Sequence, residues 1–121
     1  MSADELLAIA DAAAGRAYAP YSQFNVGCAV LTRDGRVVEG VNVENAAYPL
    51  GTCAERTALS RAVTEGLAPG GLEAIAITAP PCGGCRQWLY EFGVDRVIFR
   101  RANGEVVTRT TDELLPDSFD L

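Results

Sequence analysis

The order of the apolar segments constrains the fold of this chain more than any other feature of its sequence. Two valine-rich segments flank Asp34-Gly35, a dipeptide that favours the tight turn of a β-hairpin, and Asn103-Gly104 gives a second hairpin signal further along the chain. Between these hairpins lies a third short apolar segment, LEAIAIT, with a helical pattern on either side of it. The predicted strands are residues 24–32, 36–43, 72–78, 94–100 and 105–109.

Helical spacing of apolar residues accounts for most of the remaining chain. Ser2 and Glu5 are placed to form a capping box for the first helix, which Pro20 ends, and Thr52 with Glu55 predicts a similar N-terminus for the second. The predicted helices are residues 4–19, the segment from Thr52 to Gly66, residues 83–92 and a short turn at 112–115. Helices that alternate with strands indicate an α/β protein. We therefore predict one domain over residues 1–121, a three-layer α/β/α sandwich around a five-stranded mixed sheet.

Composition and charge narrow the class of partner. The chain has 121 residues, a net charge of −6 and 49% hydrophobic residues, which fits an ordinary globular domain. An acidic chain without a basic stripe is a poor ligand for phosphate backbones, so we expect no nucleic acid partner. The N-terminal segment lacks the pattern of a signal peptide, and no apolar run is long enough to cross a bilayer. The expected location is the cytoplasm, with no membrane partner.

The basic residues are all arginine, and the sequence contains neither lysine nor histidine. Metal binding and proton transfer must therefore be carried out by Cys, Asp or Glu side chains. Four cysteines in a protein of a reducing compartment favour a metal or catalytic role over disulfides.

Three of the four cysteines lie in two short motifs, Cys53-Ala54-Glu55-Arg56 and Pro81-Cys82-Gly83-Gly84-Cys85. Zinc prefers a tetrahedral set of ligands, and a catalytic zinc keeps three protein ligands and one open position for water. Each motif stands at the start of a predicted helix, where the helix dipole favours the thiolate form. The motifs therefore predict a Zn²⁺ site held by Cys53, Cys82 and Cys85, with the Glu55 carboxylate close enough to act on the water without binding the metal.

Two other interpretations of these cysteines remain open at this point. A structural zinc site needs a fourth ligand, and the only spare thiol is Cys28, whose apolar strand favours a core position. A thioredoxin-like redox pair would use Cys82 and Cys85 alone and would give Glu55 no role.

The two cysteine motifs together resemble those of the zinc deaminases. Further segments resemble the small homotetrameric cytidine deaminases: Pro20-Tyr21-Ser22-Gln23-Phe24, Val26-Gly27, Asn42-Val43-Glu44-Asn45-Ala46-Ala47-Tyr48 and Leu114-Leu115-Pro116-Asp117-Ser118-Phe119. The resemblance covers residues 17–119. It implies hydrolytic deamination of cytidine or deoxycytidine in pyrimidine salvage, with Glu55 as the proton carrier, and assembly into a homotetramer.

The same resemblance implies how the nucleoside is held. Asn42 and Glu44 would bind the sugar hydroxyls, because a site built to pair them rejects a ligand that lacks them. The other implied contacts are stacking of Phe24 on the base, a hydrogen bond from the Ala54 N–H, a substrate contact from Tyr48, and insertion of Phe119 into a neighbouring subunit's pocket.

Arg56 is predicted to adjust the charge of the metal site. Three thiolates on Zn²⁺ leave a net charge of −1, which the Arg56 guanidinium would reduce by donating to a thiolate sulfur.

Similar enzymes carry a longer segment than Thr78-Ala79-Pro80-Pro81 before the second motif, so the cavity wall beside the base is expected to differ. A deaminase of another aminopyrimidine nucleoside and a non-catalytic zinc module are the alternative functions.

Overall fold

The computed structural model describes residues 1–121 and contains one mixed sheet of five strands. The strand order is β2-β1-β3-β4-β5; β3 and β4 are parallel, and the other neighbours are antiparallel. The strands are β1 (Gly27–Thr32), β2 (Val37–Val41), β3 (Leu72–Ile77), β4 (Arg96–Arg100) and β5 (Val106–Arg109). The predicted mixed sheet, with a hairpin at either end, is confirmed.

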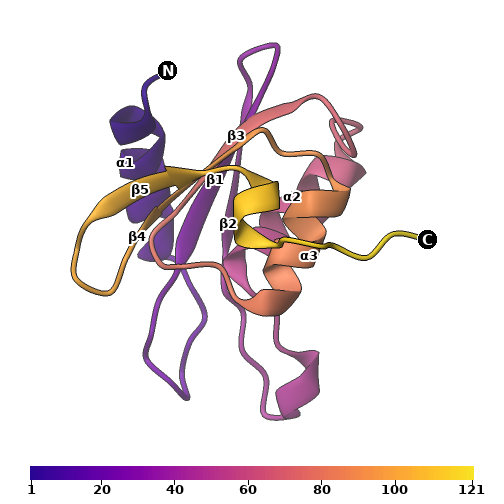
Figure 1. Cartoon of the computed structure of the whole chain (residues 1–121). Helices are drawn as coiled ribbons and strands as arrows, with labels where there is room; N and C mark the ends of the chain where they lie inside the picture. The colour runs from indigo at the N-terminus through magenta and orange to yellow at the C-terminus, as the bar shows by residue number, and fades with distance from the viewer.

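Helices cover both faces of the sheet and complete the predicted three layers. Helix α1 (Ala3–Ala14) lies on one face, and α2 (Ala54–Thr64) and α3 (Gly83–Glu91) lie on the other (Figure 1). Each face has its own apolar core, one centred on Leu6, Leu31 and Ile98 and the other on Leu59, Ile75 and Leu89. A 3₁₀ turn, Tyr48–Leu50, and a short helix α4 (Thr111–Leu114) complete the elements. No helix has the length and apolar character that spanning a membrane requires.

The first helix is shorter than predicted, although its Ser2–Glu5 capping box is confirmed. It ends at Ala14 with Gly15 as its C-cap, not at Ala19. The chain beyond it pairs with the segment after β2: the Tyr18 N–H donates to the Asn42 carbonyl at 3.1 Å, and the Glu44 N–H donates to the Tyr18 carbonyl at 2.8 Å. This pairing satisfies backbone groups that would otherwise need another helical turn.

The first strand begins at Gly27, three residues later than predicted, because a side chain replaces the expected strand pairing. The Asn42 side-chain oxygen accepts from the Val26 N–H at 2.8 Å, and its side-chain nitrogen donates to the Phe24 carbonyl at 2.8 Å. An amide side chain can satisfy one donor and one acceptor in this way. The segment from Phe24 to Val26 is therefore held in place without being part of the sheet.

The second helix begins one residue later than predicted, with Cys53 as its N-cap. The prediction of a Thr52 cap was wrong, because Thr52 forms a two-way backbone bridge with Val43 at 2.8 and 2.9 Å. No side chain caps the helix, so Glu55 is not held in a capping box. As a result, the Cys53 sulfur stands at the helix N-terminus, and the Glu55 side chain is not bonded back to the N-cap backbone.

Gly40 allows α2 to lie directly against β2. A Cβ atom at this position would stand 2.5 Å from the Ala54 carbonyl oxygen, 2.5 Å from the Ala58 nitrogen and 2.7 Å from the Ala58 Cβ. Real Cβ atoms do not approach backbone so closely, and Ala54 and Ala58 are completely buried. The glycine therefore fixes the height of α2 above the sheet, and with it the position of the residues at the start of that helix.

We expect Gly40→Ala to lower the free energy of unfolding by about 1–3 kcal/mol, because the added methyl group overfills a closely packed contact. Urea unfolding followed by circular dichroism measures the change. Gly15→Ala is the matched control, because its added Cβ would have its nearest neighbour, the Ala12 carbonyl oxygen, at 3.6 Å. Equal stability of the two variants would show that the contact at Gly40 is not restrictive.

Candidate active site

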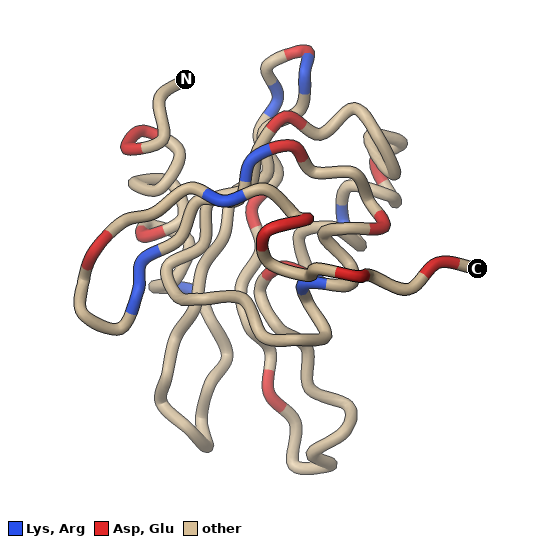
Figure 2. The backbone as a smooth tube through the Cα atoms, viewed as in Figure 1, with Lys and Arg blue, Asp and Glu red and all other residues tan.

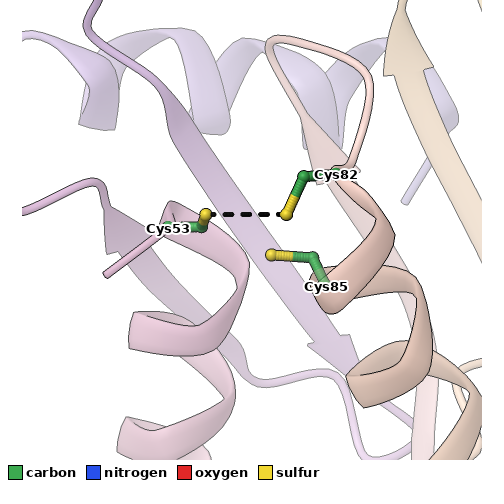
Figure 3. Close-up of side chains that lie close together, drawn as sticks. All are labelled: Cys53, Cys82 and Cys85. Carbon is green, nitrogen blue, oxygen red and sulfur yellow. Dashed lines mark hydrogen bonds between the residues drawn. The ribbon is translucent and has the colours of Figure 1, made fainter. Parts of the chain in front are cut away.

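Three cysteine sulfurs gather where α2 and α3 begin. Cys53 is the N-cap of α2, Cys82 is the N-cap of α3, and Cys85 lies in the first turn of α3. Their sulfurs all lie within 4.8 Å of one another, and the Cys53 and Cys82 sulfurs are 3.8 Å apart. Figure 3 shows the three side chains pointing toward one another from the two helix ends. Helix N-termini favour negative charge, so both dipoles stabilise thiolates at this point.

The donor set fits a zinc ion. Zn–S bonds of about 2.3 Å in a tetrahedral set place the sulfurs about 3.8 Å apart, which is the spacing of Cys53 and Cys82. No fourth metal-binding side chain joins the cluster. Cys28 is fully buried in the core, where its thiol donates to the Ala54 carbonyl oxygen at 3.1 Å. The structure thus gives a three-cysteine set, as expected of a catalytic zinc, and does not supply the fourth ligand that a structural site requires.

Charge in the cluster is concentrated and only partly balanced. Burial, followed by the neighbouring charges of Glu55 and Cys53, raises the pKa of the Cys85 thiol. Burial also opposes ionisation of Cys82, but hydrogen bonds from the Cys85 backbone and from the Cys85 and Cys53 side chains lower its pKa on balance. Bringing several anions together is costly without a cation, so the chemistry of this donor set suits a divalent metal.

Arg56 brings a positive charge to the cluster. Its Nη2 donates to the Cys53 sulfur at 3.4 Å, and this contact with Cys53 raises the pKa of the guanidinium. Its Nε is buried and has no hydrogen-bond partner. The predicted contact between Arg56 and a cysteine sulfur is therefore present.

Glu55 lies beside the sulfurs and is 3% exposed. Burial raises the pKa of its carboxyl, the shift expected of a group that exchanges protons near neutral pH. Together with Cys53 and Cys82 it lines a cavity of about 360 Å³, a size suited to a small organic ligand.

The cavity brings together most of the residues predicted to bind a substrate. Phe24, Asn42, Glu44 and Ala54 all line it, with Glu55 and two of the cysteines at its base. Ala79 and Pro80, from the short loop before the second cysteine motif, form part of its wall. The sequence predicted no ligand contact for the other lining residues, which are Ser22, Val26, Val43, Gly51 and Thr52. The Pro-Tyr-Ser motif included Ser22, but nothing in the sequence showed which side chain it would contact.

Tyr48 and Phe119 lie outside this cavity. Tyr48 is 91% exposed and lines a neighbouring cavity of about 290 Å³ together with Tyr21, Ser22, Glu44 and Asn45. Phe119 is in the C-terminal tail, where its carbonyl accepts from the Gln87 side chain at 3.0 Å and its ring is exposed. Neither side chain reaches the cavity of its own chain, so their predicted substrate contacts stay predictions.

A five-stranded α/β/α sandwich with three thiols at paired helix N-termini defines a metal-dependent class of enzyme, and comparison with known proteins identifies the family. Residues 1–101 match the model of the cytidine and deoxycytidylate deaminase zinc-binding region. The chain belongs to this family, and its cofactor is zinc.

Individual relatives agree with this assignment. The chain is 45% identical to a cytidine deaminase of Halalkalibacterium halodurans over 85% of its own length and 83% of the relative's. It is 42% identical to a cytidine deaminase of Mycobacterium tuberculosis, covering 90% and 83% of the two chains. The crystal structure of a cytidine deaminase from Burkholderia pseudomallei superimposes with a TM-score of 0.92 at 44% identity, over 98% of this chain and all of that one (100%).

We expect the Cys82→Ser variant to lose zinc and the Cys28→Ala variant to keep it, because only the first removes a sulfur from the cluster. Metal analysis of the purified, dialysed proteins measures the zinc content per chain, and circular dichroism checks the fold. Loss of zinc from Cys28→Ala would show that all four thiols serve the metal, as in a structural site.

Proposed function

We propose that this chain hydrolyses the 4-amino group of cytidine and deoxycytidine, giving uridine or deoxyuridine and ammonia. The observation that carries the proposal is the buried Glu55 carboxyl beside the three-sulfur cluster, at the base of a cavity large enough for a nucleoside. The relatives named cytidine deaminase, which match over most of the chain, support the same reaction.

The proposed mechanism assigns the proton transfers to Glu55. When bound, zinc supplies a Lewis acid that makes water a usable nucleophile near neutral pH. Glu55 takes a proton from the attacking water and delivers it to ring N3, which makes C4 more electrophilic. The same carboxyl then takes the remaining proton from the hydroxyl that has added to C4 and donates it to the amino nitrogen, which leaves as ammonia when its bond to C4 breaks. Its burial suits both steps, because a raised pKa keeps the carboxyl able to accept and release protons.

The cavity walls are proposed to orient the nucleoside. Phe24 would stack on the base, the Ala54 N–H would donate to it, and Glu44 would accept from a sugar hydroxyl. Asn42 has a smaller part in sugar binding than the sequence implied. Its side chain already bonds the backbone at Phe24 and Val26, so it has one N–H donor and limited acceptor capacity left for a ligand.

The electrostatics of the cavity favour a neutral nucleoside over its phosphorylated form. The only acidic side chains that line it are Glu44 and Glu55, and no arginine is among the lining residues. Most arginines instead pair with carboxylates elsewhere and are scattered over the molecule in Figure 2. A phosphate bound in this cavity would therefore lack a cationic partner.

Assembly and setting are also proposals. Four aromatic side chains are exposed: Phe24 of the cavity, Tyr21 and Tyr48 of the neighbouring cavity, and the tail residue Phe119. Their exposure supports burial against further copies of the chain, as in a homotetramer. We propose that Tyr48 and Phe119 contact the substrate only in that assembly.

We further propose that residues 1–121 form one domain and that the protein is located in the cytoplasm. A role in pyrimidine salvage is proposed because the reaction converts one free pyrimidine nucleoside into another.

Glu55→Gln tests the mechanism. We expect it to retain zinc and fold but to lose at least about 10² in kcat, the lower range for general acid–base catalysis. The fall in cytidine absorbance measures the rate, with a zinc chelator added to the wild-type protein as the reference for metal loss. Full activity in the variant would remove Glu55 from the mechanism. Zinc binding without any turnover by the wild type would favour a non-catalytic zinc module.

Cytidine and cytidine 5′-monophosphate test the electrostatic argument. We expect kcat/KM for the nucleoside to exceed that for the nucleotide by roughly 10²-fold, because about 2.7 kcal/mol is a modest cost for placing an unpaired phosphate beside carboxylates. Inorganic phosphate added to the cytidine reaction controls for ionic strength. Comparable values for the two substrates would contradict the proposal that the cavity excludes phosphate.

A further inference from the structure

The carboxylate of Glu44 is held by two residues of a loop far away in sequence. Its Oε1 accepts from the Tyr21 N–H at 3.0 Å and from the Ser22 N–H at 3.1 Å, and its Oε2 accepts from the Ser22 hydroxyl. The Ser22 hydroxyl, the Ser22 N–H and the Tyr21 N–H lower the pKa of Glu44, so the group is ionised and acts only as an acceptor. A carboxylate held at both oxygens has little freedom to rotate.

Ser22 also connects Glu44 to the residue proposed to stack on the base. Its hydroxyl oxygen accepts from the Phe24 N–H at 3.0 Å while its proton goes to Glu44. The Ser22 hydroxyl therefore connects Glu44, proposed to bind the sugar, with Phe24, proposed to stack on the base. Ser22 itself lines the cavity, and it is exposed, so its hydroxyl contributes nothing to the apolar core.

The remaining hydrogen-bonding capacity of Glu44 is small. A carboxylate offers about four acceptor positions, and these contacts occupy both positions on Oε1 and one on Oε2. The position left on Oε2 can take one donor. Glu44 lines both this cavity and the neighbouring one that Tyr48 lines. The proposed deaminase function places the nucleoside in the first cavity, so the donor that fits is a hydroxyl of that ligand.

We propose that Ser22 is a positioning residue that aims Glu44 at a single sugar hydroxyl of the substrate. This role rests on the proposed nucleoside deaminase function. It adds Ser22 to the residues that determine substrate binding and limits Glu44 to one hydrogen bond with the sugar. Without the Ser22 hydroxyl, Oε2 gains a second free position and the carboxylate can turn, so the hydroxyl of the substrate meets a less well-ordered acceptor.

The test compares Ser22→Ala with the wild type on cytidine, 2′-deoxycytidine, 3′-deoxycytidine and 2′,3′-dideoxycytidine. We expect kcat/KM to fall roughly 10-fold, mainly through KM, for the substrates that carry the hydroxyl bound by Glu44. For the dideoxynucleoside the fall should be within about twofold, and one of the two monodeoxynucleosides should behave like it. Loss of the acceptor for the Phe24 N–H affects all four substrates equally, so the ratio of the penalties isolates the contribution of Glu44.

Further variants strengthen the comparison. Ser60→Ala is the matched control, because Ser60 is exposed on α2 and does not line the cavity. Ser22→Thr should keep the wild-type preference for substrates with the hydroxyl that Glu44 binds, and Ser22→Val should lose it. Because Thr and Val have similar shapes, this pair gives the result even if Ser22→Ala is poorly folded. In a Glu44→Gln background, Ser22→Ala should add no further substrate-dependent penalty.

The outcomes separate the two proposals. An equal penalty on all four nucleosides, or none on any, would overturn the positioning role while leaving the deaminase function intact. Penalties on both monodeoxynucleosides as large as on cytidine would overturn the single-hydroxyl assignment. Absence of turnover by the zinc-loaded wild type would instead overturn the deaminase function, and this inference with it.

Discussion

The contact between α2 and the sheet at Gly40 is the constraint on which the site depends. This contact brings the start of α2 against β2. In addition, the Cys28 thiol of the neighbouring strand β1 donates to the Ala54 carbonyl oxygen at the start of the helix. These two contacts fix the first turn of the helix, and therefore the Cys53 sulfur and the Glu55 carboxyl on either side of Ala54. The second half of the cluster follows from the parallel pairing of β3 and β4, because the crossover between them places the N-terminus of α3 beside that of α2. The arrangement of the three sulfurs is thus a consequence of helix–sheet packing.

The two sides of the cavity are built in different ways. The metal side stands on helices packed against the sheet, whereas the substrate side consists of loops that extend below the sheet in Figure 1 and are joined by side chains. Asn42 bonds to the backbone at Phe24 and Val26, and Ser22 bonds to Glu44. Loops held by a few polar contacts can change without disturbing a packed core. The residues proposed to choose the substrate are therefore separated physically from those proposed to hold the metal. This separation explains why two short cysteine motifs identify the chemistry but leave the ligand open.

Much of this arrangement could be predicted from the sequence, for identifiable reasons. The dipeptides Asp34-Gly35 and Asn103-Gly104 predicted both hairpins correctly, because the residues of a tight turn determine its conformation locally. The two cysteine motifs predicted the sulfur cluster, because each motif marks the start of a helix. The predictions failed where distant groups decide the structure. Thr52 would suit a helix cap, but its backbone pairs with Val43, so Cys53 takes that place. Likewise, the restraint of Glu44 by Ser22, 22 residues earlier in the chain, has no local signature.

The charge distribution links these observations to the choice of ligand. The sequence has no charged residue between Ala17 and Thr32, and Glu44 is the only one between Gly40 and Ala54, so the loops around the cavity carry a single carboxylate. Beside the cavity, Glu55 and the three-cysteine cluster add negative charge that the Arg56 guanidinium and a divalent cation would offset. A ligand that enters this environment is favoured when it is neutral and offers hydrogen-bond donors. A free nucleoside meets both requirements, since its base can pack on an apolar wall and its sugar hydroxyls can donate to Glu44, whereas a phosphate meets neither.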